Sequence, residues 1–257
     1  MRITLRSKGV NALPSDVAEG LRSVARVPRL LVTSDFDGTL APIVDHPGDA
    51  RPLPAAAAAL RALADLPATT AALISGRALR DLAVLSGMAA PVHLVGSHGA
   101  EFDTGFAHQI DTALLGRITD ELTAIAADRP GVTVETKPAS VALHIRNASR
   151  DDGEAALAKA RAAAESWDAH ATAGKAVLEF AVITTDKGEA IDILRERDDA
   201  SAVVFFGDDV TDEKAFRRMR DRDVGVKVGD GDTLASFRVA SPDDVAAALE
   251  FLLAERS

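Results

Sequence analysis

The chain has 257 residues, a formal net charge of −10 and no cysteine. The acidic charge, without a block of Lys or Arg, argues against a nucleic-acid-binding protein. The missing thiols exclude disulfides, cysteine nucleophiles and zinc–thiolate sites. No apolar run approaches the roughly 18 residues of a membrane span, and residues 1–29 carry charges and no signal-peptide core. We expect a cytoplasmic protein with no nucleic-acid, membrane or obligate protein partner.

Short apolar runs alternate with helical segments along most of the chain. Four strands are predicted at residues 29–35, 69–75, 91–97 and 201–208, and a fifth, with a weaker signal, at residues 223–229. The helices that follow several of them are predicted at residues 54–66, 78–87, 186–198 and 211–222. This alternation is typical of an α/β fold with a parallel sheet.

The middle of the chain follows a different order, namely helix, strand, strand, helix, strand. The KPAS link between its first two strands is too short for a crossover connection and predicts an antiparallel hairpin. We expect residues 109–182 to form an inserted α+β domain with an antiparallel sheet and two helices. Residues 1–108 and 183–257 are expected to form the larger α/β domain.

Two carboxylates lie at the carboxyl end of the first predicted strand, the edge of a parallel sheet where ligands bind. Asp35 and Asp37 lie two positions apart in DFDGTL, so in an extended segment both point the same way. An ordinary turn explains Asp and Gly here, whereas an EF-hand loop fails because its sixth position is Leu40 and its twelfth is His46. The alternative is a Mg²⁺ ion that offsets the repulsion and leaves Asp35 to act as a nucleophile. The spacing alone leaves both interpretations open.

Two further strand ends carry weaker signals. Ser75, followed by Gly76 and Arg77, fits an ordinary helix N-cap or a hydroxyl and amides that hold a phosphate oxygen. Lys187 lies in the first turn of a predicted helix, where an exposed lysine is usually only solvated. Because a cation opposes the helix dipole at that end, this position favours an anionic partner.

The last strand end is rich in aspartate. Asp208, Asp209 and Asp212 lie within five residues of one another. A helix cap formed by Thr211 or Asp212 explains part of this pattern. Three acids at the end of a buried strand are more than a cap needs, and they suit a metal site.

Together these four strand ends resemble the haloacid dehalogenase (HAD) superfamily of phosphohydrolases. Its motifs are DxD, Ser or Thr, Lys, and an acidic GDD, in that chain order, and DFDGTL, ISGR, DKG and GDDVTDE match them. The resemblance implies a Rossmann-like core with Mg²⁺ as its cofactor. The insert lies between the Ser and Lys motifs, where this superfamily places its larger, substrate-selecting type of cap domain.

The resemblance also implies a role for each motif residue. Asp35 attacks phosphorus, and Asp37 protonates the leaving alcohol and then activates water. Asp35, the backbone carbonyl of Asp37, and Asp208 hold Mg²⁺. The remaining motif residues are Ser75 and Lys187, which hold phosphoryl oxygens, and Asp209 and Asp212, which are auxiliary to the metal.

Further segments are similar to the trehalose-6-phosphate phosphatases. They are LVGSHGAEF (94–102), VETKPASVALHIR (134–146), KAVLEF (175–180) and GDDVTDEKAF (207–216). The similarity implies hydrolysis of a small-molecule sugar phosphate, trehalose 6-phosphate. The residues that it assigns to the substrate are Gly38, Thr39, Gly76, Arg77, His98, Glu101, Glu135, Lys137, Arg146, Lys175 and Glu179. One departure is Ala181-Val182, where that family often has Arg-Pro.

The predicted strands of the insert alternate apolar and charged side chains. This alternation predicts one apolar face and one charged face that includes Glu135, Lys137 and Glu179. A half-solvated antiparallel sheet produces the same pattern, and only the resemblance favours sugar contacts. Two alternatives stay open: a phosphatase for a sucrose or mannosylglycerate phosphate, and a non-catalytic regulatory domain on the same scaffold.

Overall fold

The computed structural model describes residues 13–174 and 176–257. The chain forms two compact units, one comprising Met1–Gly105 with Asp186–Ser257 and the other Phe106–Thr185. Lys175, one of the predicted substrate residues, lies outside the described residues. Within the described ranges, no helix is both long enough and apolar enough to cross a membrane.

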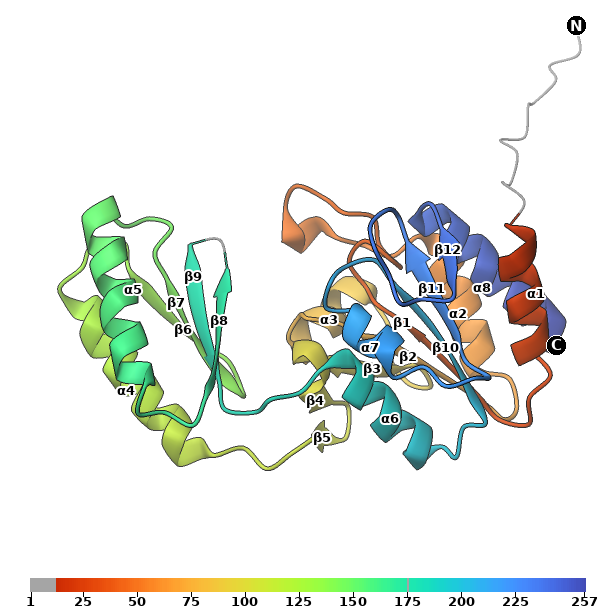
Figure 1. The fold of residues 1–257 in the computed structure, drawn as a ribbon, viewed down its shortest axis with the longest axis horizontal. Helices are drawn as coiled ribbons and strands as arrows, with labels where there is room; N and C mark the ends of the chain where they lie inside the picture. The colour runs from red at the N-terminus through yellow and green to blue at the C-terminus, as the bar shows by residue number, and fades with distance from the viewer. Residues whose placement is uncertain (1–12, 175) are drawn as a thin grey trace, which may run out of the picture. The chain divides into compact units, whose positions relative to one another are not determined.

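The larger unit is built on an eight-stranded sheet with the order β12-β11-β10-β1-β2-β3-β4-β5 (Figure 1). Neighbouring strands from β12 to β3 pair in parallel, and β4 pairs antiparallel with β3. Its strands are β1 (Leu30–Ser34), β2 (Thr69–Ile74), β3 (His93–Gly96), β4 (Glu101–Phe102), β5 (Gly105–Phe106), β10 (Ala202–Gly207), β11 (Val224–Val228) and β12 (Phe237–Val239). This arrangement confirms the predicted α/β class.

Helices cover both faces of this sheet, which explains why the central strands are continuous apolar runs. Its helices are α1 (Ser15–Val24), α2 (Pro54–Ala64), α3 (Leu79–Ser86), α6 (Lys187–Arg197), α7 (Glu213–Arg217) and α8 (Pro242–Arg256). Helices α1, α2 and α8 pack on the face that carries Val204 and Phe206. Phe205 points the opposite way, and its ring lies 5.3 Å from that of Phe216 in α7.

Several elements differ from the sequence-based expectation. Helices α1 and α8 and strands β4, β5 and β12 were not predicted. The predicted helix 211–222 is wrong in its length, because α7 ends at Arg217. The chain turns there because the carboxylate of Asp223 accepts hydrogen bonds from the backbone amides of Arg220 (2.7 Å) and Val203 (2.8 Å).

The smaller unit is an α+β domain with a four-stranded antiparallel sheet of order β6-β7-β9-β8. Its elements are α4 (Thr112–Ala127), β6 (Thr133–Thr136), β7 (Ser140–His144), α5 (Arg150–Ala164), β8 (His170–Gly174) and β9 (Val177–Ala181). The β6–β7 hairpin confirms the prediction from the KPAS link. The prediction of three strands was wrong, because β8 forms an additional edge strand beside β9.

One face of this second sheet is apolar, as the alternation predicts. Leu178 and Phe180 of β9 are buried with Leu114, Ile118 and Leu122 of α4. Trp167 packs edge-on against the Phe180 ring, with a centroid distance of 4.9 Å. The opposite face carries the charged side chains.

Candidate active site

The DFDGTL loop leaves β1 between the ends of β10 and β2 and is held against Asp208. The backbone amide of Asp35 donates to the carbonyl of Phe206 (2.9 Å), which continues the β1–β10 pairing. Gly38 has a φ of +79°, and a Cβ at this position would lie 2.1 Å from Oδ2 of Asp208. Thr39 is buried and donates to Oδ1 of Asp208 (3.2 Å). Gly38 and Thr39 therefore bring the first and last motifs together.

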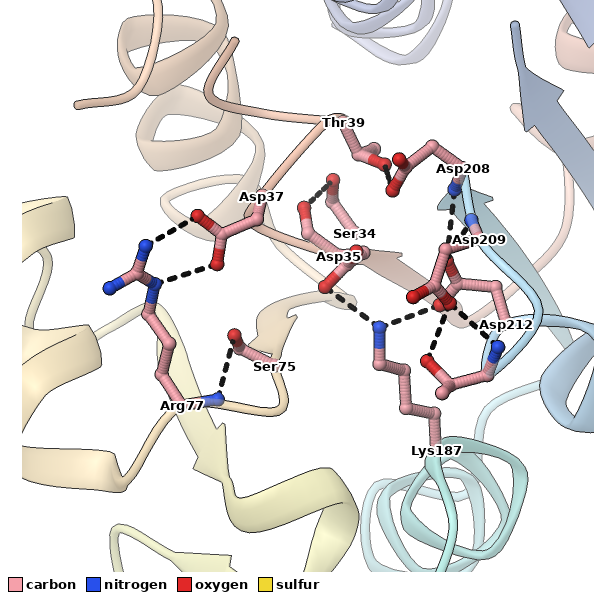
Figure 2. A network of polar contacts seen from close by, with 11 residues as sticks. Ser34, Asp35, Asp37, Thr39, Ser75, Arg77, Lys187, Asp208, Asp209 and Asp212 are labelled. Atoms are coloured by element: carbon pink, nitrogen blue, oxygen red, sulfur yellow. Dashed lines mark hydrogen bonds and ion pairs between the residues drawn. The ribbon is translucent and has the colours of Figure 1, made fainter. Parts of the chain in front are cut away.

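Lys187, the first residue of α6, lies between two aspartates (Figure 2). Its Nζ is 2.8 Å from Oδ1 of Asp35 and 2.7 Å from Oδ1 of Asp212, and only 3% of its surface is exposed. Burial lowers the pKa of Lys187, but the attraction of the two carboxylates outweighs it and raises the pKa overall. The sequence alternative of a solvated lysine is therefore wrong.

Three carboxylates gather beside this lysine. Oxygen atoms of Asp35, Asp208 and Asp212 all lie within 4.8 Å of one another. Burial raises the pKa of Asp35 well above its ordinary value, and burial likewise raises the pKa of Asp208. Clustered carboxylate oxygens are the ligands that Mg²⁺ prefers, so this donor set fits the implied metal.

Asp212 and Asp209 also hold the acidic loop in place. Oδ2 of Asp212 accepts from the backbone amides of Asp208 (2.8 Å) and Asp209 (3.0 Å), while its other oxygen faces Lys187. Oδ1 of Asp209 accepts from the amide and hydroxyl of Thr211 at 2.6 and 2.7 Å. Burial raises the pKa of Asp209, but these hydrogen bonds and the charge of Lys187 lower it overall.

Asp37 is held by Arg77, which follows β2. Nε and Nη2 of Arg77 each lie 2.6 Å from an oxygen of the Asp37 carboxylate. The hydrogen bond to Asp37 raises the pKa of Arg77, and its guanidinium lies 5.7 Å from the Phe36 ring centroid. Ser75 is buried and accepts a hydrogen bond from the amide of Arg77 (3.2 Å). The second motif thus reaches the first through Arg77.

Residues of all four motifs line one cavity of about 450 Å³ in the larger unit. The residues that surround it are Asp35, Asp37, Ile43, Ser75, Gly76, Arg77, His98, Lys187, Asp208, Asp209 and Thr211. Gly76 makes room for His98, because a Cβ there would lie 2.5 Å from Cε1 of the imidazole ring. All four motifs predicted from the sequence therefore meet in one place.

The predicted substrate residues of the smaller unit lie mainly on its charged face. Glu179 accepts from Nζ of Lys137 (3.0 and 3.1 Å) and from the hydroxyl of Ser140 (2.6 Å). Oε2 of Glu135 lies 2.8 Å from Nε2 of His144. Arg146 is exposed and follows the end of β7.

Comparisons with known proteins agree with this geometry. The family model of trehalose-phosphatase matches residues 33–243. The chain belongs to the trehalose-phosphatase family.

Mycobacterial proteins are among the curated relatives of this family member. The chain is 37% identical to the trehalose-phosphate phosphatase of Mycobacterium marinum over 90% of its own length and 65% of that protein. It is 33% identical to the trehalose-phosphate phosphatase of Mycobacterium leprae over its whole length and 70% of that protein. The chain thus spans less than two thirds of the length of the first of these relatives.

Solved structures show the same fold. The trehalose-6-phosphate phosphatase of Aspergillus fumigatus has a TM-score of 0.71 and 25% identity, with 95% of this chain and 99% of that chain covered. The C-terminal domain of the Candida albicans trehalose synthase regulatory protein has a TM-score of 0.63 and 13% identity, with 93% and 99% covered. These likenesses confirm the HAD-like α/β core with its additional antiparallel sheet.

In this trehalose-phosphatase family member, Glu101 and Lys227 depart from the sequence-based expectation. Glu101 is buried, accepts from the amide of Leu79 (2.7 Å) at the start of α3, and does not line the cavity. Lys227 was not predicted, yet its Nζ donates to the backbone carbonyl of Asp208. The available signal was a lysine inside the apolar run VGVKV, where a charge needs a partner.

Proposed function

We propose that this chain hydrolyses trehalose 6-phosphate to trehalose and phosphate, as a Mg²⁺-dependent phosphoric monoester hydrolase. The observation that carries the proposal is the position of Asp35. Its carboxylate lies at the end of a central strand, beside Asp208 and 2.8 Å from Nζ of Lys187, in a cavity that also contains Asp37. A nucleophile, a cation for phosphoryl oxygens and an acid–base group are therefore within one pocket.

The chain's own residues account for both halves of the reaction. An oxygen of Asp35 attacks phosphorus, the bond to the sugar oxygen breaks, and Asp37 gives that oxygen a proton. Asp37 then takes a proton from water, which attacks the aspartyl-phosphate and releases phosphate. Lys187 and the Ser75 hydroxyl stabilise the phosphoryl oxygens as charge develops on them.

The metal has a place among the same residues. Asp35, the backbone carbonyl of Asp37, and Asp208 would hold Mg²⁺, with Asp209 and Asp212 auxiliary to it. When bound, Mg²⁺ offsets the repulsion between the carboxylates and stabilises negative charge on the phosphoryl group.

We further propose that residues 109–182 act as a cap domain that recognises the sugar, while residues 1–108 and 183–257 form the catalytic core. The charged face of the smaller sheet supports this division, because it presents both donors and acceptors. Lys137 and Glu179 form an ion pair there, with side chains 30% and 34% exposed. A disaccharide offers hydroxyl groups that suit both kinds of partner.

The test is phosphate release from a panel of sugar phosphates with Mg²⁺. We expect trehalose 6-phosphate to be hydrolysed with the highest kcat/KM. A preference for a sucrose or mannosylglycerate phosphate would support the proposed phosphatase reaction but contradict trehalose 6-phosphate as the substrate. Absence of phosphate release from every substrate, aryl phosphates included, would favour the regulatory-domain alternative. The assembled Asp35, Asp37, Lys187 and Asp208 argue against that alternative, because a regulatory domain needs none of them.

A further inference from the structure

Lys227 is a buried charge that the proposed reaction does not use. All five residues of β11 are buried, and Lys227 has 4% of its surface exposed. The other four are valines or glycine. An apolar side chain would fill this position without the free-energy cost of removing an ammonium group from water. We therefore look for the reason for this lysine in the polar group that its ammonium contacts.

That group belongs to the acidic loop of the active site. Nζ of Lys227 donates to the backbone carbonyl of Asp208, and among the described residues this oxygen is its one hydrogen-bond partner. The other buried cations have carboxylate partners: Arg195 pairs with Asp223 (2.5 Å), and Lys187 pairs with two aspartates. The charge of Lys227 is thus not cancelled by a direct ion pair.

The pairing of β11 with β10 places Lys227 beside the loop that carries Asp208. Lys227 is the parallel partner of Gly207, the residue before Asp208. A Cβ at Gly207 would lie 2.5 Å from Cγ of Asp212, so the side chains on this face of the sheet meet the acidic cluster. Lys227 does not line the cavity itself. Its ammonium group therefore lies behind the cavity wall.

The formal charges of the site show what such a cation contributes. Four aspartates line the cavity and Asp212 lies against Lys187, whereas Lys187 and Arg77 are the Lys and Arg residues that line it in the described part of the chain. If all five carboxylates are ionised, a bound divalent cation leaves one negative charge in excess, before a phosphate monoester brings about two more. A further positive charge behind the wall lowers the repulsion that the phosphate meets.

We propose that Lys227 is a positioning residue of the phosphate site, which fixes the carbonyl of Asp208 and supplies the positive charge that lets the acidic pocket accept a phosphate dianion. This inference rests on the proposed phosphatase function. It places a determinant of phosphate affinity on β11, outside the four motifs.

The experiment compares Lys227→Met, which keeps the side-chain length, with Lys227→Arg, which keeps the charge. Lys214→Met, on the exposed side of α7, is the matched control. Isothermal titration calorimetry measures the affinity for inorganic phosphate at saturating Mg²⁺, and separately the affinity for Mg²⁺ without phosphate. Thermal melting reports the stability of each variant.

We expect Lys227→Met to weaken phosphate binding about tenfold, since a unit positive charge is lost beside the loop of Asp208, which lines the cavity. Its Mg²⁺ affinity should stay equal or increase, because the removed charge repels cations. Lys227→Arg should restore phosphate binding, and Lys214→Met should match the wild type.

Three results would overturn the inference. They are unchanged phosphate affinity in Lys227→Met, a loss of Mg²⁺ affinity comparable with any loss of phosphate affinity, and failure of Lys227→Arg to restore binding. The second result would mean that the lysine only holds the loop. If the wild-type protein neither binds phosphate with Mg²⁺ nor releases it from any ester, the proposed function fails, and this inference fails with it.

Discussion

Arg77 holds the carboxylate of Asp37 at two points, with both N···O distances at 2.6 Å. Paired charged hydrogen bonds of this kind fix the plane of the carboxylate as well as its position. Asp37 is the proposed acid–base group, so it must exchange one of these bonds for the leaving oxygen or the attacking water. The resemblance assigns Arg77 to the substrate, whereas the structure shows its guanidinium bonded to the carboxylate of Asp37.

Replacing Arg77 tests this orienting contact. Arg77→Met keeps the stem and removes the guanidinium, so Asp37 loses its fixed direction. We expect kcat for trehalose 6-phosphate to fall about tenfold or more, within the usual contribution of acid–base catalysis. The fall should be smaller for p-nitrophenyl phosphate, whose leaving group needs no proton. A rise in KM at unchanged kcat would instead support the assignment of Arg77 to substrate binding.

Asp35→Asn should abolish turnover without unfolding the protein. The amide keeps the size of the side chain but cannot attack phosphorus, so we expect activity below about a hundredth of wild type. Activity above that level would contradict the assignment of the nucleophile.

The melting temperature of Asp35→Asn tests the electrostatics of the same site. Burial raises the folded-state pKa of Asp35, so its carboxylate form costs folding free energy at any pH above the ordinary aspartate pKa. In EDTA at neutral pH, the variant should therefore melt at the wild-type temperature or above it. A clearly lower melting temperature would show that the ion pair with Lys187 outweighs the cost of burial.

The motifs were predictable because each follows a buried strand, and parallel strands bring their carboxyl ends to one edge of the sheet. Contacts between motifs were not predictable, since they depend on three-dimensional placement. The sequence does not show that Arg77 reaches Asp37, that Glu101 caps α3, or that Lys227 meets Asp208. Strand β8 was missed for another reason: HATAG contains mostly small residues, and it is held beside β9 through backbone pairing.

Chelation tests the metal. EDTA should stop phosphate release and Mg²⁺ should restore it, because the clustered carboxylates otherwise repel the phosphoryl group. Asp208→Asn should raise the Mg²⁺ concentration needed for half-maximal activity, since it removes one proposed ligand charge. Asp120→Asn, an exposed position on α4, is the control and should behave as wild type. Full activity in metal-free buffer would contradict the role of Mg²⁺.

The charged face of the smaller sheet makes a prediction about substrate size. Glu179 accepts hydrogen bonds from Lys137 and Ser140 and remains 34% exposed, so it can exchange partners with a sugar hydroxyl. Contacts remote from phosphorus affect only those substrates that are large enough to reach them. Glu179→Ala should therefore lower kcat/KM for trehalose 6-phosphate at least about tenfold, which corresponds to one or two charged hydrogen bonds.

Hydrolysis of the small ester p-nitrophenyl phosphate distinguishes a loss of sugar recognition in this variant from damage to its structure. It carries no disaccharide, so Glu179→Ala should hydrolyse it nearly as fast as wild type, and Glu135→Ala should show the same split. The control is Glu154→Ala, because Glu154 forms an exposed ion pair with Arg150 on α5 (2.9 Å) and such pairs contribute little to stability. The control should leave both substrates unaffected. If Glu179→Ala lowers kcat/KM equally for both substrates, its bonds to Lys137 and Ser140 stabilise the sheet. The charged face then does not recognise the sugar.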